Sequence, residues 1–300
     1  MRIPTTLLTI ILLSSFQVFS QDKKNESYDV KSTNVVNGIY MLEGQGGNIG
    51  LSIGADGIFM IDDQFARGTS EILKAIEKLS DQPVSFLLNT HHHGDHTGGN
   101  VNLAQKGAII VSHENVRERL QMMQEEKPEN RTEENTLPII TFSEDIKFHY
   151  NDDDIFIFHV HDAHTDGDAI VYFTKNNVLH TGDTFFNGKY PYIDTKGGGS
   201  LDGYIVALKR IVMIANEDTK IIPGHGKLGS IKDVKKLLKV LTTLKTKITS
   251  EIEKGSTKEE IASNKKITAD FDAQGYGDGF INGEKIRTVM YDEITKDLED

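Results

Sequence analysis

The sequence predicts a protein of the α/β class (α+β), in which two β-sheets pack as a sandwich with helices outside. Three observations support this prediction. Short apolar blocks separated by glycines occupy residues 28–62, a strand, helix, strand order follows them, and a second strand-rich block precedes two helical patterns. Because each half has strands that end at a His or an Asp, we expect each half to form one sheet.

The first half is expected to begin with antiparallel hairpins. Its apolar residues alternate or run in short blocks, separated by the turn residues Gly38, Gly46-Gly47 and Asp56-Gly57. The period then changes, because apolar residues from Ile72 to Leu79 recur at helical spacing. A short buried strand at residues 84–88 completes the strand, helix, strand order.

The second half repeats this order without a sequence repeat. Its expected strands are residues 146–149, 155–160, 169–173 and 178–180, and its expected helices are residues 204–214 and 234–248. The second helix has a continuous apolar stripe and ends before Gly255, as helices often do. Strands therefore precede helices in this half, as a sheet covered by helices requires.

The N-terminus has the features of a signal peptide. Arg2 precedes an apolar run from Leu7 to Val18, and a small-residue site ends at Ser20. We therefore assign residues 1–20 to a signal peptide and residues 21–300 to a single domain, with a C-terminal helical extension from about residue 230. The apolar run is too short to span a bilayer, so we expect an exported, periplasmic or secreted protein without a membrane span.

Composition limits the partners and the metal chemistry. The formal net charge of -12 is spread along the chain, which disfavours nucleic acids and leaves a small-molecule substrate as the expected partner. Composition does not fix the oligomeric state. The chain has no Cys, so imidazole and carboxylate groups must hold any soft metal ion.

The strongest chemical signal is a histidine cluster directly after the strand at residues 84–88. His91 and His93 are two residues apart, so in an extended loop both can point to the same side, while Asp95 and His96 can turn towards a neighbouring position. Imidazole and carboxylate suit Zn²⁺, with Mn²⁺ or Fe as alternatives. The cluster therefore predicts two adjacent metal sites, and a His-rich surface turn is the alternative.

The string H-x-H-x-D-H at residues 91–96 resembles the signature of the metallo-β-lactamase superfamily. Later motifs resemble those of the family in the same order: His164 within residues 160–168, Asp183 in His180-Thr181-Gly182-Asp183-Thr184, and His225 in Ile222-Pro223-Gly224-His225-Gly226. This resemblance extends from about Tyr28 to Gly226. It implies the fold of the family, a four-layer αββα sandwich of two mixed β-sheets.

The resemblance also implies a role for each motif residue, with two Zn²⁺ ions per chain as the cofactor. The implied ligands are His91, His93 and His164 for one metal ion, Asp95, His96 and His225 for the other, and Asp183 between them. Asp62 matches an earlier motif and would lie behind the ligands, holding the His loop by hydrogen bonds; a solvated turn acid is the alternative. We expect His92, His113 and His180 to be structural.

The chemistry of two such ions predicts hydrolysis. Two divalent ions a few ångströms apart lower the pKa of a shared water to roughly 7, so a hydroxide is available at neutral pH, and they polarise a carbonyl oxygen. Asp95 is the expected catalytic residue, because it could both ligate and orient that nucleophile. The sequence therefore predicts a dinuclear zinc hydrolase.

The substrate is less sharply indicated. The true β-lactamases of the family commonly carry Cys or Ser in place of the bridging Asp, and the Cys-bearing group has a Lys where this chain has Phe186. Asp183 makes the chain more similar to the glyoxalase-II-like and lactonase-like members. We expect cleavage of an ester, thioester, lactone or lactam carbonyl, with β-lactamase-type activity included. Lys189 is a candidate substrate-binding residue, and an ordinary surface Lys is the alternative.

Three other functions stay open at this point. Members of the superfamily that oxidise persulfides bind a single iron with the ligands of the first metal, and other members are phosphodiesterases. The length and acidity of this chain leave no room for the nucleic-acid-binding domain that nuclease-like members usually carry. A non-catalytic metal-binding protein is the remaining alternative, and it would have a closed site without an exchangeable water.

Overall fold

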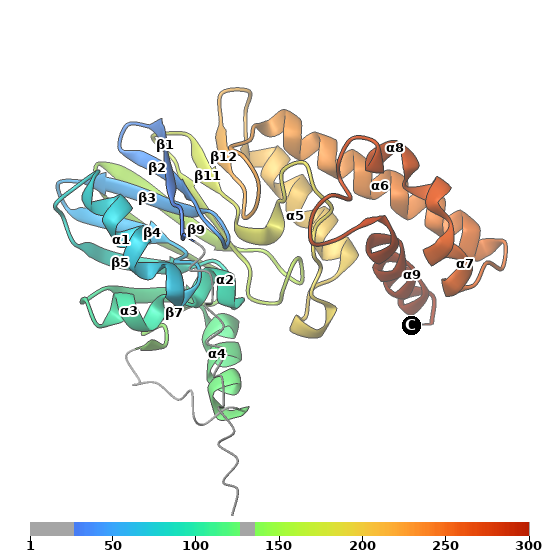
Figure 1. Cartoon of the computed structure of the whole chain (residues 1–300), viewed down its shortest axis with the longest axis horizontal. Helices are drawn as coiled ribbons and strands as arrows, with labels where there is room; N and C mark the ends of the chain where they lie inside the picture. Colours follow the sequence, from blue (N-terminus) through green and yellow to red (C-terminus); the bar gives the residue numbers. More distant parts are fainter. Residues whose placement is uncertain (1–26, 127–135, 300) are drawn as a thin grey trace, which may run out of the picture.

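The computed structural model describes residues 27–126 and 136–299. The signal peptide assigned to residues 1–20 lies outside the described residues and stays a prediction. In the described part, two β-sheets lie face to face, and helices cover both outer faces (Figure 1). The predicted fold class, a sandwich of two mixed sheets with helices outside, is therefore confirmed.

The first sheet is formed by the N-terminal half of the chain. It has seven strands in the order β1-β2-β3-β4-β5-β6-β7, of which the first four pair antiparallel and the rest pair parallel. The hairpin-rich start predicted for residues 28–62 is thus present. The strands are β1 Lys31–Val36, β2 Ile39–Glu43, β3 Ile49–Gly54, β4 Gly57–Ile61, β5 Val84–Asn89, β6 Ile109–His113 and β7 Ile140–Phe142.

The second sheet has five strands in the order β12-β11-β10-β9-β8. All its pairs are antiparallel except β11 with β12, which run parallel. The strands are β8 Asp145–Tyr150, β9 Asp153–His159, β10 Ala169–Phe173, β11 Val178–His180 and β12 Lys220–Ile222. Four of these segments were expected from the sequence. The three-residue strand β12 was not, because it is too short to show a period.

Helices connect and cover the sheets. The helix expected around residues 72–79 is α1, and the two expected in the second half are α5 and α6. The described helices are α1 Thr69–Glu77, α2 Gly94–Thr97, α3 Asn100–Ala104, α4 Glu114–Glu126, α5 Leu201–Ile214, α6 Ile231–Glu253, α7 Lys258–Ser263, α8 Ala269–Asp272 and α9 Gly283–Glu299. No helix in residues 27–126 and 136–299 combines the length and apolar character needed to cross a membrane.

Alternation along the strands produces the layers. Successive side chains of a strand point to opposite faces, so in β4 Phe59 and Ile61 enter the core between the two sheets, while Ile58 and Met60 pack towards α1 and α3. In β10 Val171 faces the other sheet and Ile170 faces the α5 and α6 side. Every residue of β4 is buried for this reason.

The last four helices form a unit beside the sandwich (Figure 1). The helix α6 begins where Asp233 accepts a hydrogen bond from the backbone N–H of Ser230 at 2.9 Å, and it ends before Gly255, which has a positive φ of 90°. Its apolar stripe packs against α5, and α9 packs back onto α6 and α7. The chain after β12 is thereby brought back towards the strand ends of the second sheet.

Candidate metal centre

The histidine cluster lies where β5 ends, at one edge of the sandwich. His93 has extended backbone torsions (φ -67°, ψ 145°), and the single helical turn α2 begins directly after it. The extended part directs His91 and His93 to one place, with His91 Nε2 3.2 Å from His93 Nδ1. The turn then directs Asp95 and His96 to an adjacent place, so one short segment contributes to two groups of ligand atoms.

The first group, here the three-histidine group, consists of His91, His93 and His164. His164 comes from the loop between β9 and β10, and its Nε2 lies 2.9 Å from His93 Nδ1. The ligand atoms of this group and of Asp183 all lie within 4.8 Å of one another. Nitrogen ligands of a tetrahedral zinc ion are separated by about 3.3 Å, given Zn–N bonds of about 2.0–2.1 Å.

The second group, here the mixed group, consists of Asp95, His96 and His225. His225 lies after β12, and its Nε2 is 3.3 Å from Asp95 Oδ2. His96 Nε2 is 3.7 Å from the same oxygen, and the ligand atoms of the group lie within 4.8 Å of one another. His225 is far from Asp95 and His96 in the sequence, so the fold brings the three together from the strand ends of both sheets.

Asp183 lies between the two groups. Its Oδ2 is 3.4 Å from His164 Nε2 and 3.5 Å from His225 Nε2, and its Oδ1 is 3.1 Å from His96 Nε2. A Cβ at Gly224 would collide with Asp183 Oδ1, which explains the glycine before His225. One carboxylate thus faces both groups, as a shared ligand must.

Two buried atoms of the centre lack a hydrogen-bond partner among the described residues. They are His96 Nε2 and Asp183 Oδ1, which face each other without hydrogen-bond geometry. Buried polar atoms are rarely left unpaired, and such pairs often mark an ion that completes them. The set of imidazole and carboxylate donors fits Zn²⁺, and the absence of Cys excludes a thiolate site.

Two histidines of the three-histidine group, His91 and His164, are held neutral. Burial lowers the pKa of His91 well below its usual range, and the neighbouring imidazoles of His96 and His164 add to this effect. Burial also lowers the pKa of His164, to about 4, although the carboxylate of Asp183 opposes it. Neutral imidazoles have the free lone pairs that metal coordination requires.

The histidines of the mixed group carry protons in the metal-free chain. Burial acts to lower the pKa of His96, but Asp183 and Asp62 outweigh it, and the pKa is raised well above its usual range. For His225 burial is again outweighed, by Asp183 and Asp95, and the pKa rises to about 9. In return the imidazoles hold the pKa of Asp183 well below its usual range despite burial.

Asp62 supports the mixed group from behind. It is fully buried with a positive φ of 60°. Its Oδ2 lies 2.7 Å from His96 Nδ1, and its oxygens accept hydrogen bonds from the backbone N–H and the hydroxyl of Thr90, each at 2.8 Å. The carboxylate therefore fixes both the ring of His96 and the start of the His loop.

Sequence reasoning missed the residues that support the three-histidine group. Asp194 Oδ2 lies 2.9 Å from His93 Nε2, and the backbone carbonyl of Tyr192 lies 2.8 Å from His164 Nδ1. The ring nitrogen of His93 beside Asp194 holds the pKa of that carboxyl well below its usual range. Both contacts come from the irregular loop after Asp183, where no motif or period directs attention to them.

The remaining histidines lie outside both groups. His92 is buried, and its Nε2 is 4.0 Å from Asp194 Oδ2, so it could join His93 and Asp194 but neither main group. His180 Nε2 contacts the backbone carbonyl of Asn48 at 3.1 Å. His113 stacks on His159 with ring centroids 3.9 Å apart.

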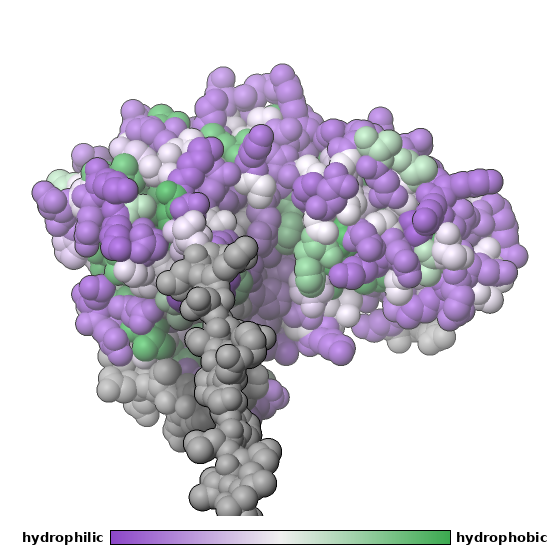
Figure 2. Space-filling model, in the orientation of Figure 1, coloured by the Kyte–Doolittle hydropathy of each residue, from purple (hydrophilic) through white to green (hydrophobic). Residues whose placement is uncertain are grey.

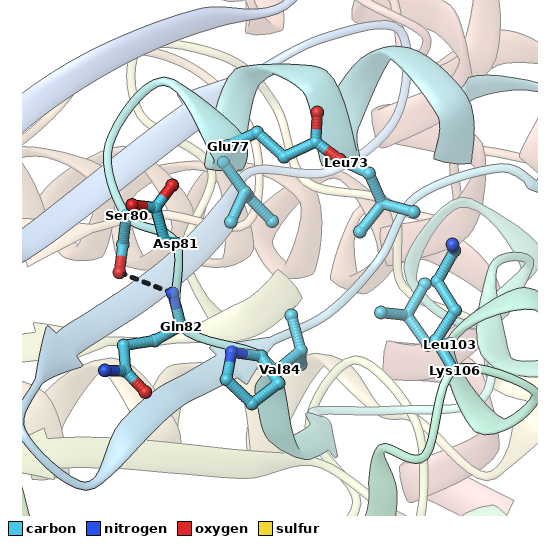
Figure 3. A pocket seen from close by; sticks show the side chains of 10 residues that line it. Leu73, Glu77, Ser80, Asp81, Gln82, Val84, Leu103 and Lys106 are labelled. Atoms are coloured by element: carbon cyan, nitrogen blue, oxygen red, sulfur yellow. Dashed lines mark hydrogen bonds between the residues drawn. The ribbon is translucent and has the colours of Figure 1, made fainter.

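The centre opens into a cavity of about 610 Å³. Lys189 lines this cavity, but its ammonium donates a hydrogen bond to the carbonyl of Gly275 at 3.0 Å. A second cavity, of about 450 Å³, lies away from the ligands, between α1, α3 and the start of β5, and Figure 3 shows Glu77, Asp81 and Lys106 around it. Its lining contains no His and none of the predicted ligands.

Sequence comparison relates this chain to known proteins. The model of the metallo-β-lactamase superfamily matches residues 54–225. The chain is 33% identical over 159 residues to the hydroxyacylglutathione hydrolase of Pelagibacter ubique (strain HTCC1062), covering 52% of this chain and 58% of that protein. It is 30% identical over 151 residues to the enzyme of the same name from Prochlorococcus marinus (strain NATL1A), covering 46% and 50%. The chain thus spans little more than half the length of these relatives.

Solved structures share the fold at low identity. A metallo-β-lactamase from Pontibacter korlensis superposes with a TM-score of 0.61 at 18% identity, covering 71% of this chain and 99% of that chain. A double mutant of the sec-alkyl sulfatase PisA1 superposes with a TM-score of 0.68 at 14% identity, covering 90% of this chain and 50% of that chain. At these identities the likeness concerns the fold.

Proposed function

The chain belongs to the metallo-β-lactamase superfamily. We propose that it is a dinuclear zinc hydrolase that cleaves the acyl C–O or C–S bond of a small ester or thioester. The observation that carries the proposal is the convergence of the three-histidine group and the mixed group on Asp183. Relatives named hydroxyacylglutathione hydrolase favour a thioester. Lactones and lactams stay in the substrate range because they present the same carbonyl chemistry.

The ligand groups divide the binding of the two ions. The three-histidine group, in which His91 and His164 are neutral, would hold one ion, and the mixed group would hold the other, with Asp183 shared. Bound zinc ions supply a water of lowered pKa and a Lewis acid for the carbonyl oxygen. The protein would contribute fixed ligands whose second nitrogens are already engaged by Asp62, Asp194 and the carbonyl of Tyr192.

Asp95 is the proposed catalytic residue. Its carboxylate lines the cavity. Burial acts to raise its pKa, but the hydrogen bond from His225 and the charge of His96 outweigh burial, and the pKa is lowered. It is therefore ionised at neutral pH. An ionised carboxylate at this place can accept a hydrogen bond from the attacking water, orient it towards the carbonyl and hold its proton for the leaving group.

The aromatic rings of Phe186 and Tyr192 lie against the ligand histidines and reduce their contact with water. The ring of Phe186 stacks on His225 with centroids 4.9 Å apart and an interplanar angle of 22°. Tyr192 lies edge-on to His164 at 5.8 Å. Aromatic rings around the ligands reduce the local dielectric constant, which strengthens each electrostatic contact made during the reaction.

The test begins with the metal content of the purified full-length chain. We expect about two zinc ions per chain, in line with the two ligand groups. A substrate screen would then cover small thioesters, aryl esters, lactones, a chromogenic β-lactam and bis-nitrophenyl phosphate. We expect turnover of thioesters or esters that a chelator abolishes and added zinc restores. A chain fully loaded with metal that hydrolyses none of them would contradict the proposal, and one iron without zinc would favour the persulfide-oxidising alternative.

We also propose export of the chain. The support is the apolar run from Leu7 to Val18 and the small residue Ser20 that follows it. Expression of the full-length chain in a bacterial host should give a protein that has lost residues 1–20 in the periplasmic fraction, which intact-mass measurement would detect. An uncleaved chain confined to the cytoplasm would contradict export.

A further inference from the structure

Beyond the ligands, the wall of the cavity is largely apolar and comes partly from the C-terminal helical unit. The ligands in the lining are His93, Asp95, Asp183 and His225. The other lining residues are mostly aromatic or aliphatic: Phe65, Phe186, Tyr190, Tyr192, Phe280 and Ile281, with Lys189 and Gly279. Figure 2 shows hydrophobic side chains bordering the hollow between the sandwich and the C-terminal helices.

This wall is fixed to the loop that follows Asp183. The backbone N–H of Tyr190 donates to the carbonyl of Tyr276 at 3.0 Å, and the hydroxyl of Tyr190 donates to Asp272 Oδ1 at 3.0 Å. The ammonium of Lys189 donates to the carbonyl of Gly275 at 3.0 Å. These bonds anchor residues 272–276, and residues 279–281 follow directly in the chain. The segment that reaches the cavity is therefore attached to the loop after Asp183 before any substrate binds.

The side chain of Phe280 lines the cavity but is only partly covered by the protein. It is 75% exposed. Its ring stands edge-on to Tyr192 with centroids 5.7 Å apart and an interplanar angle of 87°. The ammonium of Lys285 lies 4.6 Å from the centre of the same ring. The ring is thus oriented by its neighbours while one face stays accessible.

A further apolar cavity continues beyond this ring. It has a volume of about 500 Å³ and shares Tyr192, Phe280 and Ile281 with the cavity of the metal centre. Ile286 and Val289 of α9 line its far side. A group that extends from the metal ligands past Phe280 would therefore stay in contact with apolar side chains.

We propose that Tyr192 and Phe280 form a binding site for an apolar group, aryl or medium-chain alkyl, attached to the reacting carbonyl. The proposal rests on the proposed function and narrows its substrate class. Charge is compatible with it, because the ammonium of Lys189 donates to the carbonyl of Gly275, and the ammonium of Lys285 donates to the carbonyl of Phe280 at 3.1 Å, so both lysines already have partners. Such a wall suits an uncharged apolar substituent better than a peptide thiol with several carboxylates.

The test compares acyl groups at a constant leaving group. Acetyl, hexanoyl and phenylacetyl thioesters of one small uncharged thiol would be hydrolysed by the zinc-loaded wild type and by Phe280→Ala. We expect KM for the phenylacetyl and hexanoyl compounds to rise roughly tenfold in the variant, with kcat unchanged, and the acetyl kinetics to stay the same. A series of acetate esters with small and large alcohols tests the leaving-group side in the same way.

Two further variants separate a contact from a structural effect. Phe280→Leu should recover most of the lost affinity, because it restores apolar area. Met213→Ala removes a comparably exposed apolar side chain, 84% exposed on α5 and outside the cavity lining, and should change nothing. If Phe280→Ala affects acetyl and phenylacetyl substrates equally, or affects neither series, the apolar site is refuted.

A binding measurement keeps this inference separate from the proposed function. Calorimetry would compare acetate and phenylacetate binding to the zinc-loaded chain, without any turnover. We expect phenylacetate to bind more tightly to the wild type and the difference to vanish in Phe280→Ala. Loss of turnover on every carbonyl substrate with this difference intact would contradict only the proposed function, and turnover without the difference would contradict only the apolar site.

Discussion

The three-histidine group and the mixed group use similar side chains, but burial and nearby carboxylates act differently on their imidazoles before a metal binds. In the three-histidine group burial keeps His91 and His164 neutral, with the pKa of His164 at about 4. In the mixed group carboxylates outweigh burial, and the pKa of His225 is about 9. The contrast follows from position: Asp62 contacts His96 and Asp95 contacts His225, whereas at His164 burial outweighs Asp183.

This difference predicts an order of metal binding. A cation entering the three-histidine group meets free lone pairs at His91 and His164, because burial holds both imidazoles neutral. A cation entering the mixed group replaces protons that already pair with Asp183 and Asp95, so the ions compete with an existing network of ion pairs. We therefore expect the three-histidine group to be the tighter site and the mixed group to fill second.

The largest expected effect comes from breaking the residue that both groups share. Asp183→Ala should remove both metal equivalents and lower kcat/KM by about 10³-fold or more, because the activated nucleophile is lost together with its ligands. Elemental analysis and thioester hydrolysis would measure this. Asp183→Asn keeps the shape, so the same losses in that variant would separate metal binding from folding.

A second pair of variants separates the groups. His225→Ala should retain about one metal equivalent, in the intact three-histidine group, whereas His164→Ala should retain less than one, because the tighter site is damaged. Both should lose activity by about 10²-fold or more, measured as kcat/KM. Equal metal retention in the two variants would contradict the order of filling.

The matched control is His161→Ala. His161 belongs to the same motif as His164, but its side chain is 64% exposed and contacts only Glu144 at 3.8 Å among ion-pair partners in the described part of the chain. We expect full metal content and full activity in this variant. A loss comparable to that of His164→Ala would mean that the assignment within the motif is wrong.

The two groups also differ in how far the sequence predicted their surroundings. The mixed group has its support in Asp62, which follows the apolar block at residues 58–61 and was recognised because it matches a motif of the family that the sequence resembles. Asp194 supports His93 from 101 residues away, in an irregular loop whose path depends on packing against the C-terminal helices. No local pattern encodes such a path, so the sequence could not place Asp194.

The same reasoning explains the outcome for the fold. Strands such as β4 and β10 have the length and apolar content that predict them, and the fold class follows from their order. The strand β12, directly before the His225 motif, has no period, and the segment around Phe280 has neither a period nor a motif. Their positions result from tertiary packing, which also determines the apolar wall of the cavity.

Removing one supporting carboxylate at a time tests the metal affinity of each group separately. Asp194→Asn weakens the acceptor for His93, and Asp62→Asn weakens the acceptor for His96. Each should lower the affinity for one metal equivalent by about 10–100-fold and leave the other nearly unchanged. Competition with a chromogenic chelator would resolve the two equivalents. Asp202→Asn, an exposed carboxylate paired with Lys245, should change neither affinity.

The most discriminating effect is the dependence of each affinity on pH. Because the pKa of His225 is raised to about 9, this imidazole is protonated below that pH and must lose its proton when a metal binds. The affinity of the mixed group should therefore rise with pH, by about tenfold per unit for each proton released, between about pH 6.5 and about pH 8.5. The pKa of His164 lies at about 4 and that of His91 well below its usual range, so these two imidazoles release no proton when a metal binds, and the affinity of the three-histidine group should depend less on pH. Chelator competition at both pH values gives the two slopes, and calorimetry in buffers of different ionisation enthalpy counts the protons. Parallel slopes for the two equivalents would show that the charge difference between the groups does not govern metal binding.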